Sequence, residues 1–394
     1  GHGIRLAGAQ KEFQHLMEKL HLPFLLTWSA IDLTDSAHEL HCGRAGVYGQ
    51  RSSNFIVQNC DLLICIGTRM AIPQIGYEIN ELARDAKIVV LDIDAAEALK
   101  YSERMEITAK GDAGEFLQQL EESSKDCDFK REDWLQECRR LRDAFPLVEK
   151  EGIHRDPEGF INSYSFMDEM HQYLHKDQVM VTDMGTALLS GHQTIRPSKD
   201  QRLFTSLGLG EMGFGLPGAI GASLARGKGE VLCLNCDGGM MMNLQELQTV
   251  AHFQLPIKIV IFNNDGYLMI KHTQKALMKG RYTAVDKKSD VTCPDFKKVA
   301  KAFEMKSFRV ASWDEFHSEF PKMQAEAGPC IMEVMMHPEQ LLVPKLGLVP
   351  KSDGSIVSPP LEDLSPLVSQ EQLENAMKYT VMHEKSLNVR SPAT

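Results

Sequence analysis

The sequence predicts an α/β protein made of two doubly wound parallel-sheet domains and a C-terminal arm. Short apolar runs rich in β-branched residues alternate with segments of helical periodicity, which is the pattern of βαβ units. The alternation occurs twice, in residues 1–125 and again in residues 161–337. A chain of 394 residues is also long enough for about two domains.

In the first block, KEFQHLMEKL at 11–20 has helical periodicity. Three apolar runs are predicted as strands, because each is short, partly β-branched and followed by a small or polar residue. They are PFLLTW at 23–28, DLLICIGT at 61–68 and AKIVVLDID at 86–94. The charged segment 126–160 is predicted to be a linker helix over the surface.

In the second block, strand and helix patterns continue to alternate. Five segments are predicted to be strands, some with the turn that follows. They are QVMVTDMG (178–185), EVLCLNCDGG (230–239), IKIVIFNNDG (257–266), SFRV (307–310) and CIMEVMM (330–336). The tail, 338–394, is rich in Pro, Gly and Ser, which argues against a third core. We expect the tail to be either an arm packed over the second domain or flexible.

Composition narrows the function classes. The net charge of −11 does not suggest a protein that follows a nucleic-acid backbone. No apolar run approaches the roughly 20 residues that span a bilayer. Nine scattered cysteines favour a reducing, cytoplasmic compartment. Cys233 and Cys236 spell C-x-x-C, but residues i and i+3 of a strand face opposite sides, so core packing is favoured over metal or redox chemistry.

Polar residues follow two successive predicted strands. Asp237 ends one strand, and Asn264 ends the next, after a helix predicted to begin near Asn243. Parallel strands present their carboxyl ends at one edge of a sheet, where ligands bind. If the strands are neighbours, the carboxylate and the amide oxygen can hold one Mg²⁺, and Gly238 and Gly239 let backbone N–H groups approach an anion. The alternative is that Asp237 and Asn264 only cap helices and turns.

The segment CDGGMMMNLQELQTVAHFQLPIKIVIFNND, at 236–265, resembles the thiamine-diphosphate signature, in which G-D-G is followed by N-N. The wider similarity covers nearly all of 1–337 and is to the acetolactate synthase-like branch of thiamine-diphosphate enzymes. SLGLGEMGFGLPGAIGASLA (206–225) is similar to the segment that holds the cofactor's pyrimidine in that family. YGQRSSNFIVQNCDLLICIGTRM (48–70) and VVLDIDAAE (89–97) are similar to its central domain.

The resemblance implies thiamine diphosphate and Mg²⁺ as cofactors, with roles for individual residues. Asp237, Asn264 and the main-chain carbonyl of Gly266 would be the Mg²⁺ ligands. Met212 would bend the cofactor, which brings its amino group beside the reactive thiazolium carbon. The remaining cofactor contacts would be Asp183, Gly185 and Thr186 near the diphosphate, the N–H groups of Gly238 and Gly239, and the carbonyl of Gly210. FAD is a further candidate for the central domain, with weak support from GHGIRLAG at 1–8.

The chain departs from the family pattern at several positions. Cys236 replaces the first Gly of the signature, and Thr186 and Ala187 stand where polar side chains are frequent. Thr273 replaces an aromatic residue that shapes the acceptor site of acetolactate synthases. Lys271 and His272 either meet an anionic or sugar-like substrate or lie on a solvated helix face. Residues 240–242, all Met, are expected to be core packing.

The resemblance implies a carboligase that decarboxylates a 2-oxo acid, pyruvate being the expected one, and transfers the acyl carbanion to a carbonyl acceptor. A simple 2-oxo acid decarboxylase is one alternative, and a non-catalytic cofactor-binding subunit is another. The family's catalytic glutamate lies on a pyrimidine-binding domain, to which no residue here is matched. We therefore expect that domain on the rest of a longer protein or on a partner chain, and at least a dimer, with no nucleic-acid or membrane partner.

Overall fold

The computed structural model describes residues 1–127, 131–350 and 356–390. The chain forms two compact units, Gly1–Leu147 together with Val343–Thr394, and Val148–Leu342. Each unit contains a parallel sheet flanked by helices, so the predicted α/β class is confirmed. In the part of the chain that is described, every helix is too short or too polar to cross a membrane.

The first unit is built on a three-stranded parallel sheet of order β1-β2-β3. Its strands are β1 (Leu62–Ile66), β2 (Lys87–Asp92) and β3 (Ile107–Lys110). Side chains from α1 (Gly3–Leu6), α2 (Gln10–Leu20) and α6 (Ala113–Ser123) cover one face of this sheet. The shorter helices of this part of the unit are η1 (Trp28–Ala30), α4 (Ile72–Ile75), η2 (Ile79–Glu81) and α5 (Ala95–Leu99).

One predicted strand of the first unit is wrong. Residues 23–28, all within the described part of the chain, form no strand beyond a single parallel bridge between Phe24 and His41. The backbone of Phe24 still exchanges hydrogen bonds with Leu40 and Cys42, at 2.9 and 2.8 Å. Pro23 lacks an N–H, and a 3-10 turn begins at Trp28, so the extended run is too short to join the sheet.

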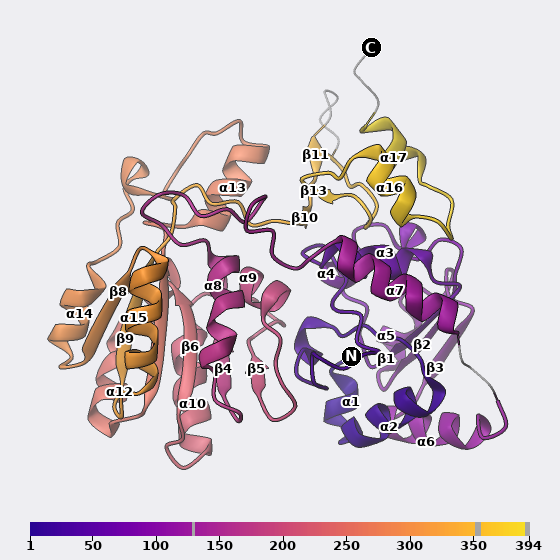
Figure 1. Ribbon diagram of the computed structural model, residues 1–394, viewed down its shortest axis with the longest axis horizontal. Helices are drawn as coiled ribbons and strands as arrows, with labels where there is room; N and C mark the ends of the chain where they lie inside the picture. The colour runs from indigo at the N-terminus through magenta and orange to yellow at the C-terminus, as the bar shows by residue number, and fades with distance from the viewer. Residues whose placement is uncertain (128–130, 351–355, 391–394) are drawn as a thin grey trace. The chain divides into compact units, whose positions relative to one another are not determined.

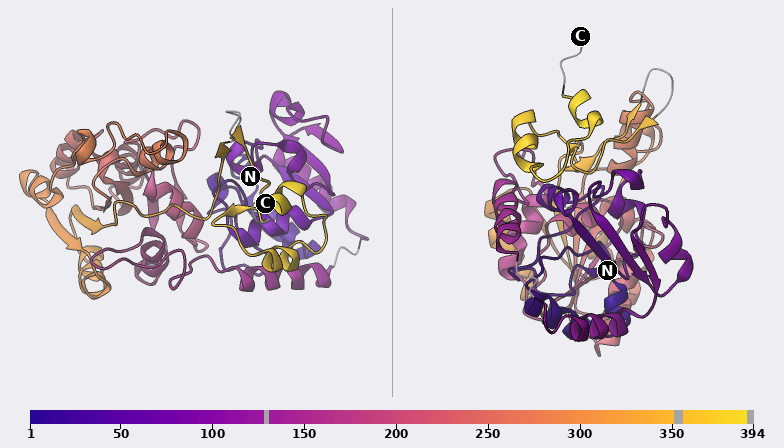
Figure 2. Two further views of the ribbon diagram at one scale, coloured as in Figure 1. Left: turned by 90° about the horizontal axis from the view of Figure 1, so that it is seen from above. Right: turned by 90° about the vertical axis from the view of Figure 1, so that its right-hand side faces the viewer.

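The C-terminal segment belongs to the first unit, which corrects the prediction of an arm over the second domain. Leu346, Leu361 and Leu364 pack in the same apolar cluster as Ile88 and Val90 of β2. Figure 2 shows this segment, in yellow, on the side of the sheet away from α2 and α6. Its elements are β10 (Lys345–Leu346), β11 (Val349–Pro350), β12 (Ile356–Val357), β13 (Leu364–Ser365), α16 (Gln370–Ala376) and α17 (Glu384–Asn388).

Helix α3 (Arg51–Asn59) explains why the segment folds back. All nine of its residues are buried, although most of them are polar. Buried polar groups need hydrogen-bond partners, and the C-terminal segment supplies several of them. The guanidinium of Arg51 donates to the carbonyls of Leu364 and Pro366, and the amide of Asn54 donates to the carbonyl of Leu361. Without this segment the polar side of α3 would lose these partners.

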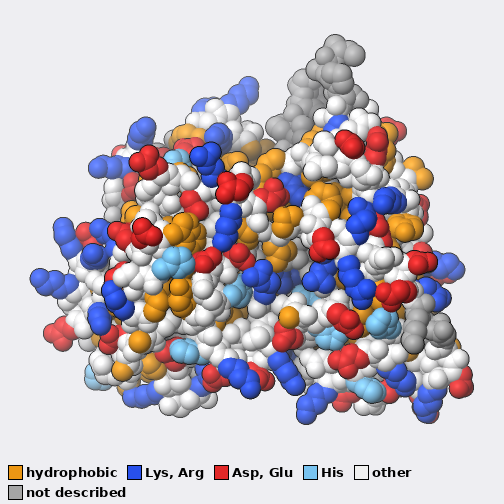
Figure 3. All heavy atoms as spheres, viewed as in Figure 1, with side chains coloured by type: hydrophobic (Ala, Val, Ile, Leu, Met, Phe, Trp, Pro, Cys, Tyr) orange, Lys and Arg blue, Asp and Glu red, His pale blue; other side chains and the backbone are white. Residues whose placement is uncertain are grey.

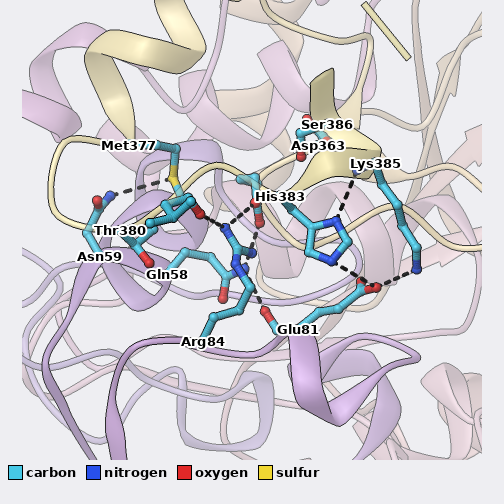
Figure 4. Close-up of polar contacts among 12 residues, drawn as sticks. Gln58, Asn59, Glu81, Arg84, Asp363, Met377, Thr380, His383, Lys385 and Ser386 are labelled. Atoms are coloured by element: carbon cyan, nitrogen blue, oxygen red, sulfur yellow. Dashed lines mark hydrogen bonds and ion pairs between the residues drawn. The ribbon is translucent and has the colours of Figure 1, made fainter. Parts of the chain in front are cut away.

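A polar network continues the attachment (Figure 4). The Glu362 carboxylate accepts from Nε2 of Gln58 at 2.6 Å and pairs with Nη2 of Arg84 at 2.8 Å. Lys385 pairs with Glu81, and Thr380 donates to Asp85. The predicted linker helix is α7 (Glu132–Ala144), whose Cys138 and Leu141 pack with Phe55 of α3. Helix α7 is therefore part of the first unit, whose N-terminal segment ends at Leu147 rather than at residue 125.

The second unit holds a six-stranded parallel sheet of order β5-β4-β6-β7-β9-β8. Its elements to β6 are α8 (Ser163–Glu169), η3 (Met170–Tyr173), β4 (Val179–Thr182), α9 (Thr186–Thr194), β5 (Arg202–Phe204), α10 (Gly215–Ala225) and β6 (Val231–Cys236). They are followed by α11 (Asp237–Met240), η4 (Leu244–Glu246), α12 (Leu247–Phe253), β7 (Ile257–Asn263) and α13 (Leu268–Leu277). The last are η5 (Lys287–Ser289), α14 (Phe296–Ala302), β8 (Lys306–Val310), α15 (Trp313–Gln324) and β9 (Cys330–Met335).

Helices cover both faces of this sheet (Figure 1). Side chains of α10, α12 and α14 pack with Ile257, Ile259 and Ile261 of β7 on one face. On the other face the ring of Phe262 meets Phe166 of α8 at 5.1 Å, and Phe166 in turn meets α15. Because the strands are buried on both faces, they read as continuous apolar runs rather than alternating ones.

The connection between β6 and β7 differs from the single helix predicted to begin near Asn243. A helical turn, α11, starts at Asp237 itself, and a 3-10 turn precedes α12. The side chain of Asn243 donates to the carbonyl of Gly213 at 2.6 Å instead of capping a long helix. Asp237 is therefore the first residue of a helical turn at the end of β6.

Charges of both signs are interspersed on the face drawn in Figure 3. Lys and Arg side chains there lie among Asp and Glu side chains, although the chain carries a net charge of −11. The charge on this face is therefore mixed.

Replacing Arg84 with Met tests the attachment of the C-terminal segment. The change leaves the Glu362 carboxylate, whose side chain is 1% exposed, without its cation. We expect the free energy of unfolding to fall by about 3 kcal/mol, since breaking a buried pair leaves an uncompensated charge. Equilibrium urea unfolding followed by the fluorescence of Trp28 and Trp134 measures the change.

The matched control is Arg139→Met, which removes the same cation from an exposed pair with Glu132. That variant should lose less than about 1 kcal/mol, because solvent screens exposed ion pairs. Equal losses in the two variants would contradict a buried anchor at Glu362.

Candidate functional site

Three candidate residues lie at the carboxyl ends of neighbouring strands of the second unit. Asp183 follows β4, Asp237 follows β6 and Asn264 follows β7. The chain runs from β4 outward to β5 and then returns to β6 on the opposite side of β4, so the strand order reverses between β4 and β6. Ligands of open α/β sheets bind at such a switch point. Strand order thus brings Asp183, Asp237 and Asn264 to one edge of the sheet, which the strand pattern of the sequence predicted for Asp237 and Asn264.

The Asp237 carboxylate joins the ends of β6 and β7. Its Oδ2 accepts hydrogen bonds from the backbone N–H of Asn264, at 3.1 Å, and from that of Gly266, at 2.9 Å. Its Oδ1 accepts from the N–H of Gly238 at 2.8 Å. The side chain is fully buried, and Oδ1, which accepts one of these hydrogen bonds, retains lone-pair capacity for a further ligand. The carboxylate is therefore fixed in position by backbone groups.

Burial raises the pKa of Asp237 to about 7, and the hydrogen bonds from the backbone amides offset only part of this effect. Among the described residues, Asp237 makes no ion pair and no cluster of three or more His, Cys, Asp and Glu side chains could hold a metal. A cation at this site would therefore be held by one carboxylate and by neutral oxygens. Such a donor set suits a hard divalent ion that keeps other oxygen ligands.

Asn264 and Gly266 belong to the turn whose backbone N–H groups are donated to Asp237. The Asn264 side chain is 5% exposed, and no hydrogen bond to its amide is found among the described residues. Gly266 must be glycine, because a Cβ there would lie 2.1 Å from the carbonyl oxygen of Val285. Val285 also accepts from the N–H of Tyr267 at 2.8 Å, so the segment around Val285 holds this turn closely. No sequence pattern had indicated the part that Val285 has here.

The glycines after Asp237 are set by close packing. A Cβ on Gly239 would lie 1.9 Å from Oδ2 of Asp183, and one on Gly238 would lie 2.4 Å from the ring of Tyr267. The N–H of Gly238 is donated to Asp237, which differs from the predicted contact with a diphosphate. The turn begins its helical conformation at Asp237, and this directs the N–H back to the carboxylate.

Asp183 holds the loop after β5. Its carboxylate accepts from the N–H groups of Gly215, at 3.0 Å, and Gly213, at 3.2 Å. Burial raises its pKa, and the hydrogen bonds from these amides act in the opposite direction. Gly185, with φ of 106°, leads into α9, whose first residue is the buried Thr186. Asp183 thus joins the end of β4 to the loop that carries Gly210 and Met212.

That loop exposes one large apolar side chain, Leu209, which is 88% exposed. Gly210 has φ of 64°, and a Cβ there would meet the methyl group of Met184 at 2.4 Å. Met212 is half-buried.

The prediction that residues 240–242 are core packing is confirmed for Met240, which is 1% exposed, and is wrong for Met241 and Met242, which are 39% and 45% exposed.

Cys236 is accommodated at the position where the family signature has glycine. Its Sγ accepts from the N–H of Ala187 at 3.3 Å, at the start of α9, and burial raises the pKa of this thiol. Cys233 lies in the apolar cluster on the α10 face. Both cysteines are buried, as the core interpretation expected.

A third cysteine, Cys293, lies beside Asp237, although the sequence did not indicate it. Burial raises the pKa of its thiol to about 12, and the charge of Asp237 adds to this effect.

Lys271 on α13 is neither a solvated residue nor a free cation. Its Nζ pairs with Asp286 at 3.1 Å and with Glu339 at 2.9 Å, and its side chain is only 11% exposed. Burial lowers its pKa, but the hydrogen bonds to Glu339 and Asp286 outweigh burial, so the pKa is raised overall. Thr273 donates to the carbonyl of Met269 within the same helix. Lys271 therefore holds α13 to the segment around Asp286.

Comparison with known proteins agrees with this arrangement. Residues 183–334 match the model of the thiamine pyrophosphate enzyme C-terminal TPP binding domain. Residues 1–120 match the model of the thiamine pyrophosphate enzyme central domain. The chain therefore belongs to the thiamine pyrophosphate enzymes, which confirms the resemblance seen in the sequence.

Curated relatives place the chain close to one branch of that family. It is 30% identical over 365 residues to the acetolactate synthase isozyme 2 large subunit of Escherichia coli K12, covering 93% of this chain and 63% of the relative. It is 30% identical to the probable acetolactate synthase large subunit of Methanocaldococcus jannaschii (87% and 57% covered) and to the acetolactate synthase large subunit of Porphyra purpurea (84% and 55%). The chain thus spans less than two thirds of each of these relatives.

Replacing Gly239 with Ala tests the close packing of the site. The new Cβ must displace the Asp183 carboxylate, since it would lie 1.9 Å from Oδ2. We expect a loss of about 1–3 kcal/mol in the free energy of unfolding, the usual effect of overpacking. Urea unfolding followed by Trp313 fluorescence measures it.

Gly221→Ala is the matched control, because a Cβ at that position of α10 meets nothing within 4 Å. This variant should gain about 0.5–1 kcal/mol, since alanine favours a helix interior over glycine. A Gly239→Ala protein as stable as the wild type would refute the packing described for the site.

Proposed function

We propose that the protein acts in a thiamine-diphosphate-dependent carboligase of the acetolactate synthase type. The reaction would decarboxylate a 2-oxo acid, pyruvate being the first to test, and transfer the acyl unit to a carbonyl acceptor. The arrangement around Asp237 carries the proposal, because one buried carboxylate at the switch point holds the turn that contains Asn264 and Gly266. The acetolactate synthase names of the relatives support the choice of reaction.

In this proposal Mg²⁺ binds to Asp237, to the side-chain oxygen of Asn264 and to the carbonyl of Gly266. The residues fit the ion in two respects. The raised pKa of Asp237 reflects a buried charge that a cation would compensate. No hydrogen bond to the side-chain amide of Asn264 is found among the described residues, so its oxygen is available to a ligand. Diphosphate oxygens would complete the shell of the ion.

The same edge of the sheet would receive the organic part of the cofactor. Thiamine diphosphate, when bound, supplies the nucleophilic carbon that takes up a 2-oxo acid and allows CO₂ to leave. Gly239, Gly185 and Thr186 would lie near the diphosphate. Met212 would support the bent shape of the cofactor, and the carbonyl of Gly210 would accept from its amino group. The protein's part is to orient these groups and to exclude water.

The proposal also includes a pyrimidine-binding domain with a catalytic glutamate. The matched models are those of the central and C-terminal domains, so a third domain would come from a longer protein or from a partner chain. In a homo-oligomer of such a longer protein, the domain of one copy would complete the site of another.

Replacing Asp237 with Asn tests the metal site directly. The change removes the negative charge and turns one acceptor oxygen into a donor. We expect the apparent Mg²⁺ affinity, measured by titration calorimetry with thiamine diphosphate present, to fall by more than about 100-fold, since even outer partners of metal sites are worth about 10–100-fold.

Asp265→Asn makes the same change at the next acidic residue of the turn, which is exposed. Its Mg²⁺ affinity should stay within about 2-fold of wild type, because exposed charges are screened by solvent. If Asp237→Asn binds Mg²⁺ and thiamine diphosphate as the wild type does, the assignment of this site fails.

Product analysis of the full-length protein separates the reaction types. With pyruvate and a second carbonyl compound, a carboligase should release CO₂ and form a ketol in equal amounts, which chromatography and CO₂ trapping quantify. Free aldehyde as the main product would instead identify a simple decarboxylase. Cofactor binding without any CO₂ release, with the pyrimidine-binding domain present, would identify a non-catalytic cofactor-binding subunit.

A further inference from the structure

A chain of polar side chains lies on the side of the Asn263–Gly266 turn away from Asp237. Nδ2 of Asn263 donates to Oε1 of Glu333 at 2.6 Å. Oε2 of Glu333 accepts from Nε of Arg309, also at 2.6 Å. Arg309 further reaches the carboxylate of Asp295, the N-cap of α14, at 3.3 Å. Glu333 is 1% exposed, so this is a buried carboxylate with both oxygens paired.

Three neighbouring strands place these residues together. Glu333 of β9 is opposite Ile261 of β7 and opposite Arg309 of β8 in the sheet register. Asn263 is two residues after Ile261, so its side chain leaves the same face of the sheet. Much of this face is apolar, and Ile261 and Ile331 belong to its core cluster. Burying a carboxylate in such a place is unfavourable unless it has a specific partner.

Asn263 connects this chain to the turn. Its Oδ1 accepts from the backbone N–H of Asp265 at 2.9 Å. Asp265 has φ of 60°, a left-handed conformation that needs support from its surroundings. The N–H groups of Asn264 and Gly266 on either side are donated to Asp237. The turn is thus held from one side by Asp237 and from the other by Asn263.

The charge of Glu333 determines which way the Asn263 amide faces. A carboxylate can only accept hydrogen bonds, so the NH₂ group of Asn263 must face Glu333 and its oxygen must face the turn. Arg309 can only donate, so the Glu333 oxygen that faces it accepts. The order of donors and acceptors is therefore set from Arg309 through Glu333 and Asn263 to the N–H of Asp265.

We propose that Glu333 and Arg309 are positioning residues for the metal-binding turn, acting through the amide of Asn263. They keep the turn in the conformation in which the N–H groups of Asn264 and Gly266 reach Asp237. The link to Mg²⁺ rests on the proposed function, whereas the effect on the turn itself does not.

The test is Glu333→Gln, which keeps the shape and removes the charge. The introduced glutamine must present its oxygen to Arg309, so its NH₂ group faces Asn263. Asn263 then turns its own NH₂ group toward the N–H of Asp265, and two donors meet. We expect hydrogen exchange of the amides at 264–266, measured without ligands, to become at least about 10-fold faster, and the apparent Mg²⁺ affinity in the presence of thiamine diphosphate to fall about 10-fold.

Glu362→Gln is the matched control. Glu362 is also a buried carboxylate between a carboxamide, Gln58, and a guanidinium, Arg84, but it lies in the first unit. This variant should lose stability while its exchange at 264–266 and its Mg²⁺ affinity stay as in the wild type. Equal effects of both variants on the turn would overturn the proposal.

The double variant Asn263→Asp with Glu333→Gln tests the order of donors and acceptors. The introduced aspartate can accept both from the NH₂ group of the introduced glutamine and from the N–H of Asp265. Every hydrogen bond is thereby restored, with the charge moved from one side chain to the next. We expect exchange at 264–266 to return to within about 3-fold of wild type, and Mg²⁺ affinity to recover with it. A purely structural role of Glu333 would not produce this rescue.

The outcomes separate the two proposals. If the wild-type protein shows no Mg²⁺-dependent binding of thiamine diphosphate, the proposed function fails, and the exchange measurements still decide whether Glu333 positions the turn. If Glu333→Gln does not fold, a folded double variant with a protected turn supports the positioning role, and a double variant that is unfolded or unprotected contradicts it.

Discussion

The site depends on one buried carboxylate that has no cationic side chain paired with it among the described residues. Asp237 lies where the strand order reverses, and its charge is held by backbone N–H groups rather than by a lysine or arginine. A buried carboxylate without a cation is unfavourable in its charged form, as the raised pKa of Asp237 indicates. The sheet therefore presents a negative site that gains most from a bound divalent ion, which is the property that the proposed function needs.

The close packing around the buried carboxylates determines which residues fit beside them. Asp183 and Asp237 both lie at the carboxyl edge of the sheet, and Gly239 lies so close to Asp183 that no side chain fits. Gly266 is fixed in the same way by Val285. Cys236 does not need to be glycine, because its side chain points toward α9 and its Sγ accepts from the N–H of Ala187. Glycine is required in this site where backbone and carboxylates approach one another, and not at every position of the family signature.

The sequence predicted which residues lie at the ends of the strands, but it did not predict which side chains pair with one another. Asp237 and Asn264 could be expected to meet because parallel strands end at one edge, a rule that needs only strand order. The pairing of Lys271 with Asp286 and Glu339, and the return of the C-terminal segment to α3, depend on contacts between residues far apart in the chain. Local pattern carries no signal for them. The polar residues of α3 were the one available indication that another segment packs against this helix, since a buried polar helix needs hydrogen-bond partners from elsewhere.

The same arrangement of side chains serves two different ends in the two units. In each, a buried glutamate lies between a carboxamide and a guanidinium, as Gln58–Glu362–Arg84 and as Asn263–Glu333–Arg309. In the first unit the carboxamide belongs to α3 and the glutamate to the C-terminal segment, so the arrangement joins distant parts of the chain. In the second unit the carboxamide continues into the turn beside Asp237. A carboxylate that accepts on both oxygens imposes one orientation on its amide partner, and at Asn263 that orientation reaches the turn on which the proposed metal site depends.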